Sequence, residues 1–217
     1  GAFQYGRDYV AVTFSRPVNA QQAVLLQNYA FTPSLTVQAA RLQQNGRTVI
    51  LRTSAALPSA TGYSVAVSGV TGADGAALSG GSPASFQTVA GSVVNIDQIQ
   101  ANPASFAAGP VTVIGQVFVP VGARTDVPSG YVQDGSGRGI NVYGLTQTPL
   151  NAIGRVAAVT GSVVLSGTTV QLTNYQSVLL ADSQPALAPL RMTVRQAQSR
   201  GWEGTYIETQ ARVSRAE

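Results

Sequence analysis

Short runs of alternating apolar residues, separated by turn-forming residues, recur along the chain and most constrain its fold. Val10, Val12 and Phe14 fall on one side of an extended backbone over residues 9–14, and residues 63–67 repeat the pattern. The 23 Gly and 11 Pro suit many tight turns and interrupt helices. A chain of 217 residues has room for two domains of roughly 100 residues. The sequence therefore predicts an all-β protein with two domains.

The clearest predicted hairpin lies in residues 37–53. Two extended runs, residues 37–44 and 47–53, flank the dipeptide Asn45-Gly46. Because Asn and Gly tolerate positive φ angles, this dipeptide predicts a two-residue type I′ turn.

Residues 1–90 resemble the bacterial Ig-like domains of surface-layer and other envelope proteins. In that family a strand closing with Phe and a Pro-containing turn precedes an Asn-Tyr pair, followed by a Leu, a Gly-Tyr pair, alternating valines and an Asp-Gly turn. The matching positions here are Phe14, Asn28-Tyr29, Leu57, Gly62-Tyr63, Val65, Val67, Gly69 and Asp74-Gly75. The resemblance implies an Ig-like β-sandwich over residues 1–90.

A second unit begins near residue 92 and carries a long predicted strand, VTVIGQVFVPVG (residues 111–122). A hairpin follows in YVQDGSGRGINVYG (131–144), and another straddles Ser166-Gly167. This order resembles the OB-fold modules of bacterial secreted proteins, including those attached to extracellular nucleases. The resemblance implies an OB-type barrel over residues 92–182.

Residues 183–217 form a proline-punctuated linker and a predicted helix and strand. A shift of 96 residues superposes Val111 on Ile207, Gly115 on Ala211 and Val117 on Val213, so this segment resembles the start of a second OB copy. One strand cannot bury its own apolar face. Three arrangements stay open: the segment packs back on the barrel, continues into a second barrel, or joins the sheet of a partner.

Missing residue types exclude most catalytic chemistry. The chain has no Cys and no His, and all 13 of its basic residues are Arg. Serine, cysteine and histidine catalytic systems, Schiff-base chemistry and the usual zinc, copper and haem ligand sets are thereby removed. The nine carboxylates are scattered over predicted turns and strand ends, and Asp74 and Asp134 suit turn roles better than calcium sites. We expect no enzymatic activity, no metal and no cofactor.

One face of the first barrel hairpin is a candidate ligand-binding surface. Its outward positions, where the alternation places polar and aromatic side chains, are Tyr131, Gln133, Asn141 and Tyr143. OB folds often bind single-stranded nucleic acid with aromatic side chains in a basic groove. Residues 92–182 carry three arginines against four aspartates, a net charge of −1, which argues against nucleic acid.

The C-terminal segment carries the local concentration of basic residues and the single tryptophan. These candidate partner-binding residues are Trp202, Arg191, Arg195, Arg200 and Arg212. Arginine and an amphipathic Trp suit contact with an acidic protein or with anionic lipid headgroups. The alternatives without a partner are arginines on a solvated face and a Trp packed in the core.

Together these features predict a non-enzymatic structural or binding module that acts through protein-protein contacts in a bacterial periplasmic, cell-surface or extracellular assembly. The alternative is an accessory OB and Ig-like region of a secreted nuclease or hydrolase that binds single-stranded nucleic acid or glycan. No stretch of about 18 apolar residues occurs, so no transmembrane segment is expected in these residues, while peripheral contact with a membrane stays open.

Overall fold

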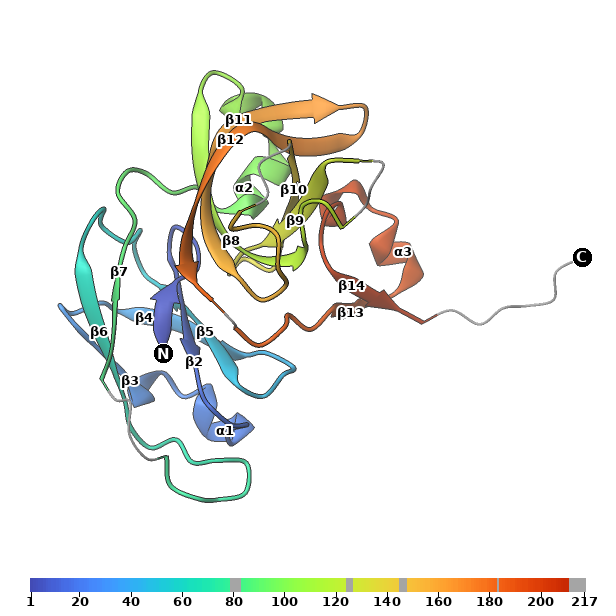
Figure 1. Cartoon of the computed structure of the whole chain (residues 1–217). Helices are drawn as coiled ribbons and strands as arrows, with labels where there is room; N and C mark the ends of the chain where they lie inside the picture. The colour runs from blue at the N-terminus through green and yellow to red at the C-terminus, as the bar shows by residue number, and fades with distance from the viewer. Residues whose placement is uncertain (79–82, 124–126, 145–147, 183, 211–217) are drawn as a thin grey trace, which may run out of the picture.

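The computed structural model describes residues 1–78, 83–123, 127–144, 148–182 and 184–210. Strands dominate these residues and none of their helices exceeds six residues, which confirms the all-β prediction. Two β-units lie next to each other, and a small extension projects beyond the second (Figure 1). The described residues hold no helix with the length and apolar character needed to cross a membrane.

The first unit consists of two sheets that enclose a common core. The larger sheet has the order β1-β2-β5-β4 and the smaller has the order β3-β6-β7. Val10, Val12, Tyr63 and Val65 all lie in the core between them, as the alternation predicts. The strands are β1 (Ala2–Gln4), β2 (Tyr9–Thr13), β3 (Tyr29–Thr32), β4 (Val37–Leu42), β5 (Thr48–Thr53), β6 (Gly62–Val67) and β7 (Ala84–Gln87), with helix α1 (Ala20–Ala23) and the 3-10 turn η1 (Leu26–Asn28) between β2 and β3.

The β4–β5 hairpin is present, but its turn is longer than predicted. The amide of Gln43 donates to the carbonyl of Thr48 at 2.8 Å, which leaves residues 44–47 as a four-residue loop. Within it Gly46 alone has a positive φ, of 66°. Asn45 instead uses its side-chain oxygen to accept hydrogen bonds from two backbone amides beyond it, at 2.8 and 3.0 Å. The type I′ prediction is therefore wrong, because capping by the Asn45 side chain stabilises a longer loop.

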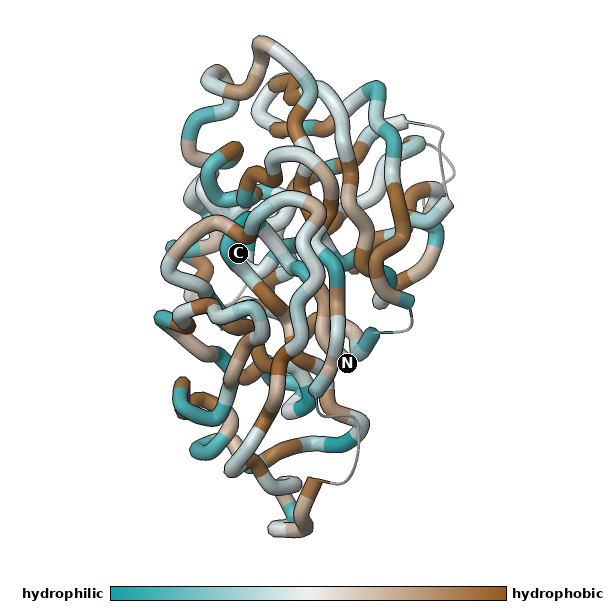
Figure 2. Tube along the Cα trace, turned by 90° about the vertical axis from the view of Figure 1, so that its left-hand side faces the viewer, coloured by the Kyte–Doolittle hydropathy of each residue, from teal (hydrophilic) through white to brown (hydrophobic). Residues whose placement is uncertain are grey.

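The second unit is a closed five-stranded barrel with the neighbour order β10-β12-β11-β8-β9. The pairing is antiparallel throughout except between β10 and β12, which run parallel and join at Asn141↔Gln171 and Val142↔Leu172. Apolar side chains that alternate along the strands fill the interior. Figure 2 shows hydrophobic residues recurring along the trace of both units. The strands are β8 (Pro110–Val119), β9 (Ser129–Gln133), β10 (Gly139–Tyr143), β11 (Val156–Ser166) and β12 (Thr169–Ala181).

A short helix before the first barrel strand covers one end of this barrel. Ile96 and Ile99 of α2 (Ile96–Ala101) are fully buried in the barrel core, and the 3-10 turn η2 (Pro103–Phe106) continues along the same end. A Cβ added at Gly115 of β8 would lie 2.8 Å from the Cβ of Val132 on β9. Glycine therefore allows the two strands to approach closely where β8 bends from β11 towards β9.

The C-terminal extension packs against the barrel, the first of the three arrangements left open by the sequence. Its elements are β13 (Leu190–Met192), α3 (Val194–Ala197), the 3-10 turn η3 (Arg200–Trp202) and β14 (Ile207–Thr209). β13 and β14 form a small parallel sheet. Of the positions matched by the 96-residue shift, Ile207 lies in β14, whereas Ala211 and Val213 lie outside the described residues.

Candidate binding surfaces

The structure divides the four predicted barrel-face residues into a covered group and an exposed one. Gln133 and Asn141 are 4% and 3% exposed. The side-chain Nδ2 of Asn141 donates a hydrogen bond to the carbonyl of Gly130 at 3.2 Å. Tyr131 is half-buried beside Phe118, with a ring-centroid distance of 6.0 Å. Tyr143, in contrast, is 41% exposed.

The C-terminal extension provides the cover over this face. The amide of Tyr206 donates to Oε1 of Gln133 at 3.0 Å, and the Tyr206 ring stacks on Phe118 at 5.6 Å. One residue earlier, the hydroxyl of Thr205 accepts a hydrogen bond from the amide of Gly139 at 3.2 Å. The face singled out as a ligand surface is therefore partly occupied by the chain's own extension.

Trp202 also contacts the barrel. The guanidinium carbon of Arg138 lies 4.1 Å from the centre of the Trp202 ring, a short cation-π contact. Partial burial lowers the pKa of the Arg138 guanidinium below its ordinary value, with Asp97 and Asp134 acting in the opposite direction. Trp202 itself is half-buried, so it forms part of the contact between extension and barrel.

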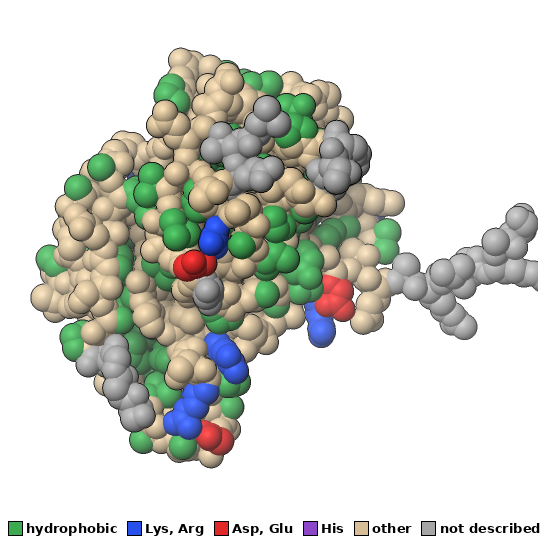
Figure 3. Space-filling model, in the orientation of Figure 1, with side chains coloured by type: hydrophobic (Ala, Val, Ile, Leu, Met, Phe, Trp, Pro, Cys, Tyr) green, Lys and Arg blue, Asp and Glu red, His purple; other side chains and the backbone are tan. Residues whose placement is uncertain are grey.

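The predicted arginines of the extension do not form one patch in the described residues. Arg191 pairs with Glu208 at 3.1 Å and remains 71% exposed, and Arg195 is exposed on α3. Arg200 begins η3, and its side chain is outside the description, as is the whole of Arg212. Figure 3 shows few charged side chains on this side of the molecule, most of them next to an opposite charge.

A joint between the two β-units has a continuous apolar core, which the sequence did not indicate. β2 and β5 are buried on both faces, because alternate residues face the sandwich core and the barrel. The side chains that meet at this joint are Phe3, Tyr5, Ala11 and Ile50 from the sandwich, with Val93, Ile114, Val156, Ala158 and Leu187 from the barrel side. Each of these side chains is 8% exposed or less.

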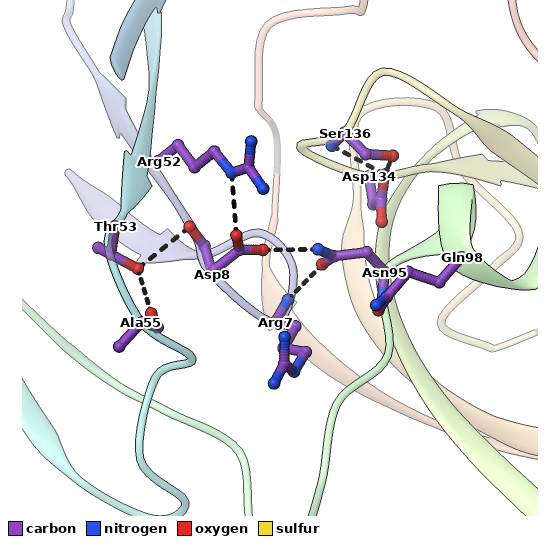
Figure 4. Close-up of polar contacts among 9 residues, drawn as sticks. All are labelled: Arg7, Asp8, Arg52, Thr53, Ala55, Asn95, Gln98, Asp134 and Ser136. Atoms are coloured by element: carbon purple, nitrogen blue, oxygen red, sulfur yellow. Dashed lines mark hydrogen bonds and ion pairs between the residues drawn. The ribbon is translucent and has the colours of Figure 1, made fainter. Parts of the chain in front are cut away.

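A buried polar network lies next to this apolar joint (Figure 4). Asn95, which precedes α2, accepts a hydrogen bond from the amide of Arg7 at 2.6 Å and donates one to Oδ1 of Asp8 at 2.5 Å. The other oxygen of Asp8 pairs with Nε of Arg52 at 3.0 Å. Both side-chain polar atoms of Asn95 thus bind groups of the sandwich, and both carboxylate oxygens of Asp8 have partners, which avoids the penalty of unpaired buried groups.

Asp134 is the fully buried carboxylate of the β9–β10 turn. It accepts hydrogen bonds from the amides of Ile96 at 2.7 Å and Ser136 at 2.9 Å, and from the Ser136 hydroxyl. Desolvation outweighs these hydrogen bonds and raises the pKa of Asp134 to about 7, with the charge of nearby Asp97 adding to the shift. The turn role expected for Asp134 fits this geometry, which also ties the turn to α2.

The residues that follow the barrel run back over the joint. The Gln184 amide donates to the Gly154 carbonyl at 3.1 Å, and its side-chain oxygen accepts from the Thr13 hydroxyl at 3.1 Å. The Gln116 side chain donates to the Pro185 carbonyl at 2.7 Å, and Leu187 is buried in the joint. This segment therefore contacts the barrel and the sandwich.

The described residues contain no cluster of three or more His, Cys, Asp or Glu side chains that could hold a metal ion. A groove of about 350 Å³ lies between residues 100–107 and the β11–β12 hairpin, and its walls carry no charged side chain. The groove's lining therefore supplies no ionisable side chain for acid-base chemistry or for binding a metal ion.

Comparison with known proteins gives only distant structural likeness. No protein-family model matches the sequence, and no characterised protein does. Among solved structures, the N-terminal part of the bacterial S-layer protein SbsC has 15% identity and a TM-score of 0.38, over 84% of this chain and 43% of that chain. The S-layer protein rSbsC(31-844) has 14% identity and a TM-score of 0.40, over 88% of this chain and 26% of that one. The chain thus spans less than half of these S-layer chains, and at such TM-scores its function is argued from its own geometry.

Proposed function

We propose that this chain is a non-enzymatic structural module of a bacterial cell-surface or extracellular assembly, in which an Ig-like sandwich and an OB-type barrel act as one rigid unit. The observation that carries the proposal is the joint, where nine apolar side chains and the Asp8–Asn95 network bury surface from both units. A rigid connection between two β-units is what an element under tension, or one that sets a spacing, needs. The absence of His and Cys from the sequence agrees with a structural role.

Strand order supports the OB assignment. In an OB fold five strands form a Greek-key barrel that is at least partly closed. The barrel here closes through β8 against β11 and through the parallel contact of β10 with β12. The two facing sheets of residues 1–90 support the Ig-like assignment in the same way. We divide the chain accordingly into residues 1–90, 92–182 and an extension, 183–217.

Fractionation of the native bacterium tests this function. We expect the protein in the surface or extracellular fraction, copurifying with a larger protein assembly. A monomer without partners in those fractions would contradict the proposal.

Nucleic-acid binding is the outcome that would favour an accessory role in a nuclease. Fluorescence anisotropy with labelled single-stranded DNA at low and moderate salt measures it, with the variant Tyr131→Ala/Tyr143→Ala as control. We expect no salt-sensitive binding, since the barrel lacks the excess of positive charge that phosphate contacts require. Salt-sensitive binding lost in that variant would establish the alternative.

A further inference from the structure

Residues 190–209 repeat the order of elements found in residues 93–112. In both segments a short extended stretch precedes a capped helix, a 3-10 turn and a strand. In both, the extended stretch pairs in parallel with the strand that follows: Val93 with Thr112 in the first, and Leu190 with Ile207 in the second. We call this arrangement the lead-in motif.

The two helices also begin in the same way. Oε1 of Gln98 accepts a hydrogen bond from the amide of Asn95 at 3.3 Å, and Oε1 of Gln196 accepts one from the amide of Thr193 at 2.9 Å. A Gln three residues after the cap residue, reaching back to the cap amide, is one half of a capping box. Cap, helix, 3-10 turn and strand therefore agree in order and in local hydrogen bonding.

The second lead-in motif meets the barrel through a contact that only glycine allows. A Cβ added to Gly139 would lie 1.9 Å from the carbonyl oxygen of Gly204, and its nearest atoms would all belong to the extension. Gly204 has a positive φ of 66°, and its own Cβ would lie 3.2 Å from the Gly139 carbonyl. The contact is specific, because it fixes the backbone of the extension on the first residue of β10.

Other contacts surround this point without burying the extension. The Gln100 side chain of α2 donates to the carbonyls of Gly139 at 2.8 Å and Glu203 at 3.4 Å. None of the side chains described between residues 188 and 210 is fully buried. Specific backbone contact with little burial is typical of an element that separates from its site without unfolding the rest.

We propose that the outer face of β9 and β10 is a docking site for a lead-in motif, and that residues 190–209 are a second copy of that motif which occupies the site as a separable element. The inference rests on the proposed structural function and adds its connecting part. Each copy contacts the unit before it, the first through its cap residue Asn95 on the sandwich and the second through residues 202–206, after its helix, on the barrel. Units of this kind would then be joined in series by copies of the lead-in motif.

Trans-binding of a synthetic peptide to the full chain tests the docking site. The labelled peptide covers residues 187–210 and is measured by fluorescence anisotropy. Gly204→Val releases the extension, because a β-branched residue is strained at φ 66°, and leaves Gly139 intact. We expect this variant to bind the peptide and wild type to bind it poorly, since the tethered copy competes at an effective concentration on the order of millimolar.

The double variant Gly139→Ala/Gly204→Val supplies the decisive control. Its released extension resembles that of the single variant, but the new Cβ obstructs the site, so peptide binding is expected to be lost. Gly109→Ala/Gly204→Val is the matched control, because a Cβ at Gly109 meets nothing within 4 Å. Failure of the single variant to bind, or equal binding by both double variants, overturns the docking site.

The claim of a second copy has its own test. A peptide with Thr193→Asn and Val194→Ile carries the cap and first helical residue of the first motif, and is expected to bind as the native peptide does. Gln196→Ala removes the capping contact and is expected to weaken binding. If the first change abolishes binding or the second has no effect, the two motifs are not equivalent. None of these results bears on surface location, which fractionation tests separately.

Discussion

The barrel contacts two neighbours, and the two contacts differ in kind. The sandwich joint buries nine apolar side chains and a network of paired polar groups. Residues 190–209 rest on the barrel through a glycine-to-glycine contact, a ring stack and a cation-π pair, and none of their described side chains is fully buried. The first contact excludes water over a continuous area, whereas the second leaves every described side chain of residues 190–209 partly or largely exposed. Two contacts of the same barrel can therefore differ greatly in how readily they separate.

Ile114→Ala is expected to have the largest effect on the joint. Ile114 is fully buried where the barrel meets the sandwich, so its loss costs about 2–5 kcal/mol of the free energy of unfolding. Urea denaturation followed by circular dichroism measures it. Val178→Ala, 64% exposed on β12, is the control and is expected to change little. A small loss for Ile114→Ala would mean that the units touch loosely.

The pH dependence of stability tests the buried Asp134. Its folded pKa, about 7, lies above the unfolded value of 3.8, so the folded state binds more protons in between and stability falls as pH rises. We expect a loss of about 2–3 kcal/mol from pH 5 to 8, by urea denaturation at each pH. Because the chain has no His and no Cys, few other groups titrate there. Asp134→Asn should flatten the slope, and an unchanged slope would refute the assignment.

Asn95→Ala is expected to weaken the polar part of the joint. It removes the partner of the Arg7 amide and of one Asp8 oxygen, at a cost of about 2 kcal/mol. Urea unfolding should then separate into two transitions, one for each unit, because the link between them is weakened first. Asn102→Ala, outside the joint, is the comparison. A single transition with unchanged midpoint would show that the apolar cluster holds the joint alone.

Trp202→Ala is expected to have the smallest effect on overall stability. It removes the cation-π contact with Arg138, worth about 0.5–1 kcal/mol, and therefore loosens the extension without unfolding the barrel. Faster hydrogen exchange at the Gly139 amide, which donates to Thr205, would report the loosening. Val194→Ala, an exposed change on α3, should leave that exchange rate as it is. If Trp202→Ala instead lowered the free energy of unfolding of the whole chain, the extension would have to be an integral part of the barrel fold.

The sequence predicted the strand-rich class because alternation is a local property. Val10 and Val12 face a core as expected, and Val132 and Ile140 lie inside the barrel. Strict alternation would put Ala11 on the outer side of its strand, opposite Val10 and Val12, yet Ala11 and Ile50 are buried under the barrel. The nearly continuous apolar runs around them are typical of strands buried on both faces, and this signal was missed.

The candidate surfaces were harder to predict, because they depend on residues far apart in the chain. Asp8 and Asn95 are 87 positions apart, and no pattern in the sequence around either residue predicts that their side chains are in contact. The alternation placed Gln133 on the outer side of β9. It could not show that Tyr206, 73 residues later, covers Gln133 there. Trp202 stood out because it is the single tryptophan, and its partner Arg138 had no such mark.

The segment that runs back over the joint also determines how force would pass through the molecule. Residues 184–187 contact Thr13 of the sandwich and Gln116 of the barrel before β13 begins. A pull applied beyond residue 190 would therefore act on the sandwich through Gln184 and on the barrel through Pro185, as well as on the end of β12. A chain held in this way resists tension with its most buried contact and yields first at the extension.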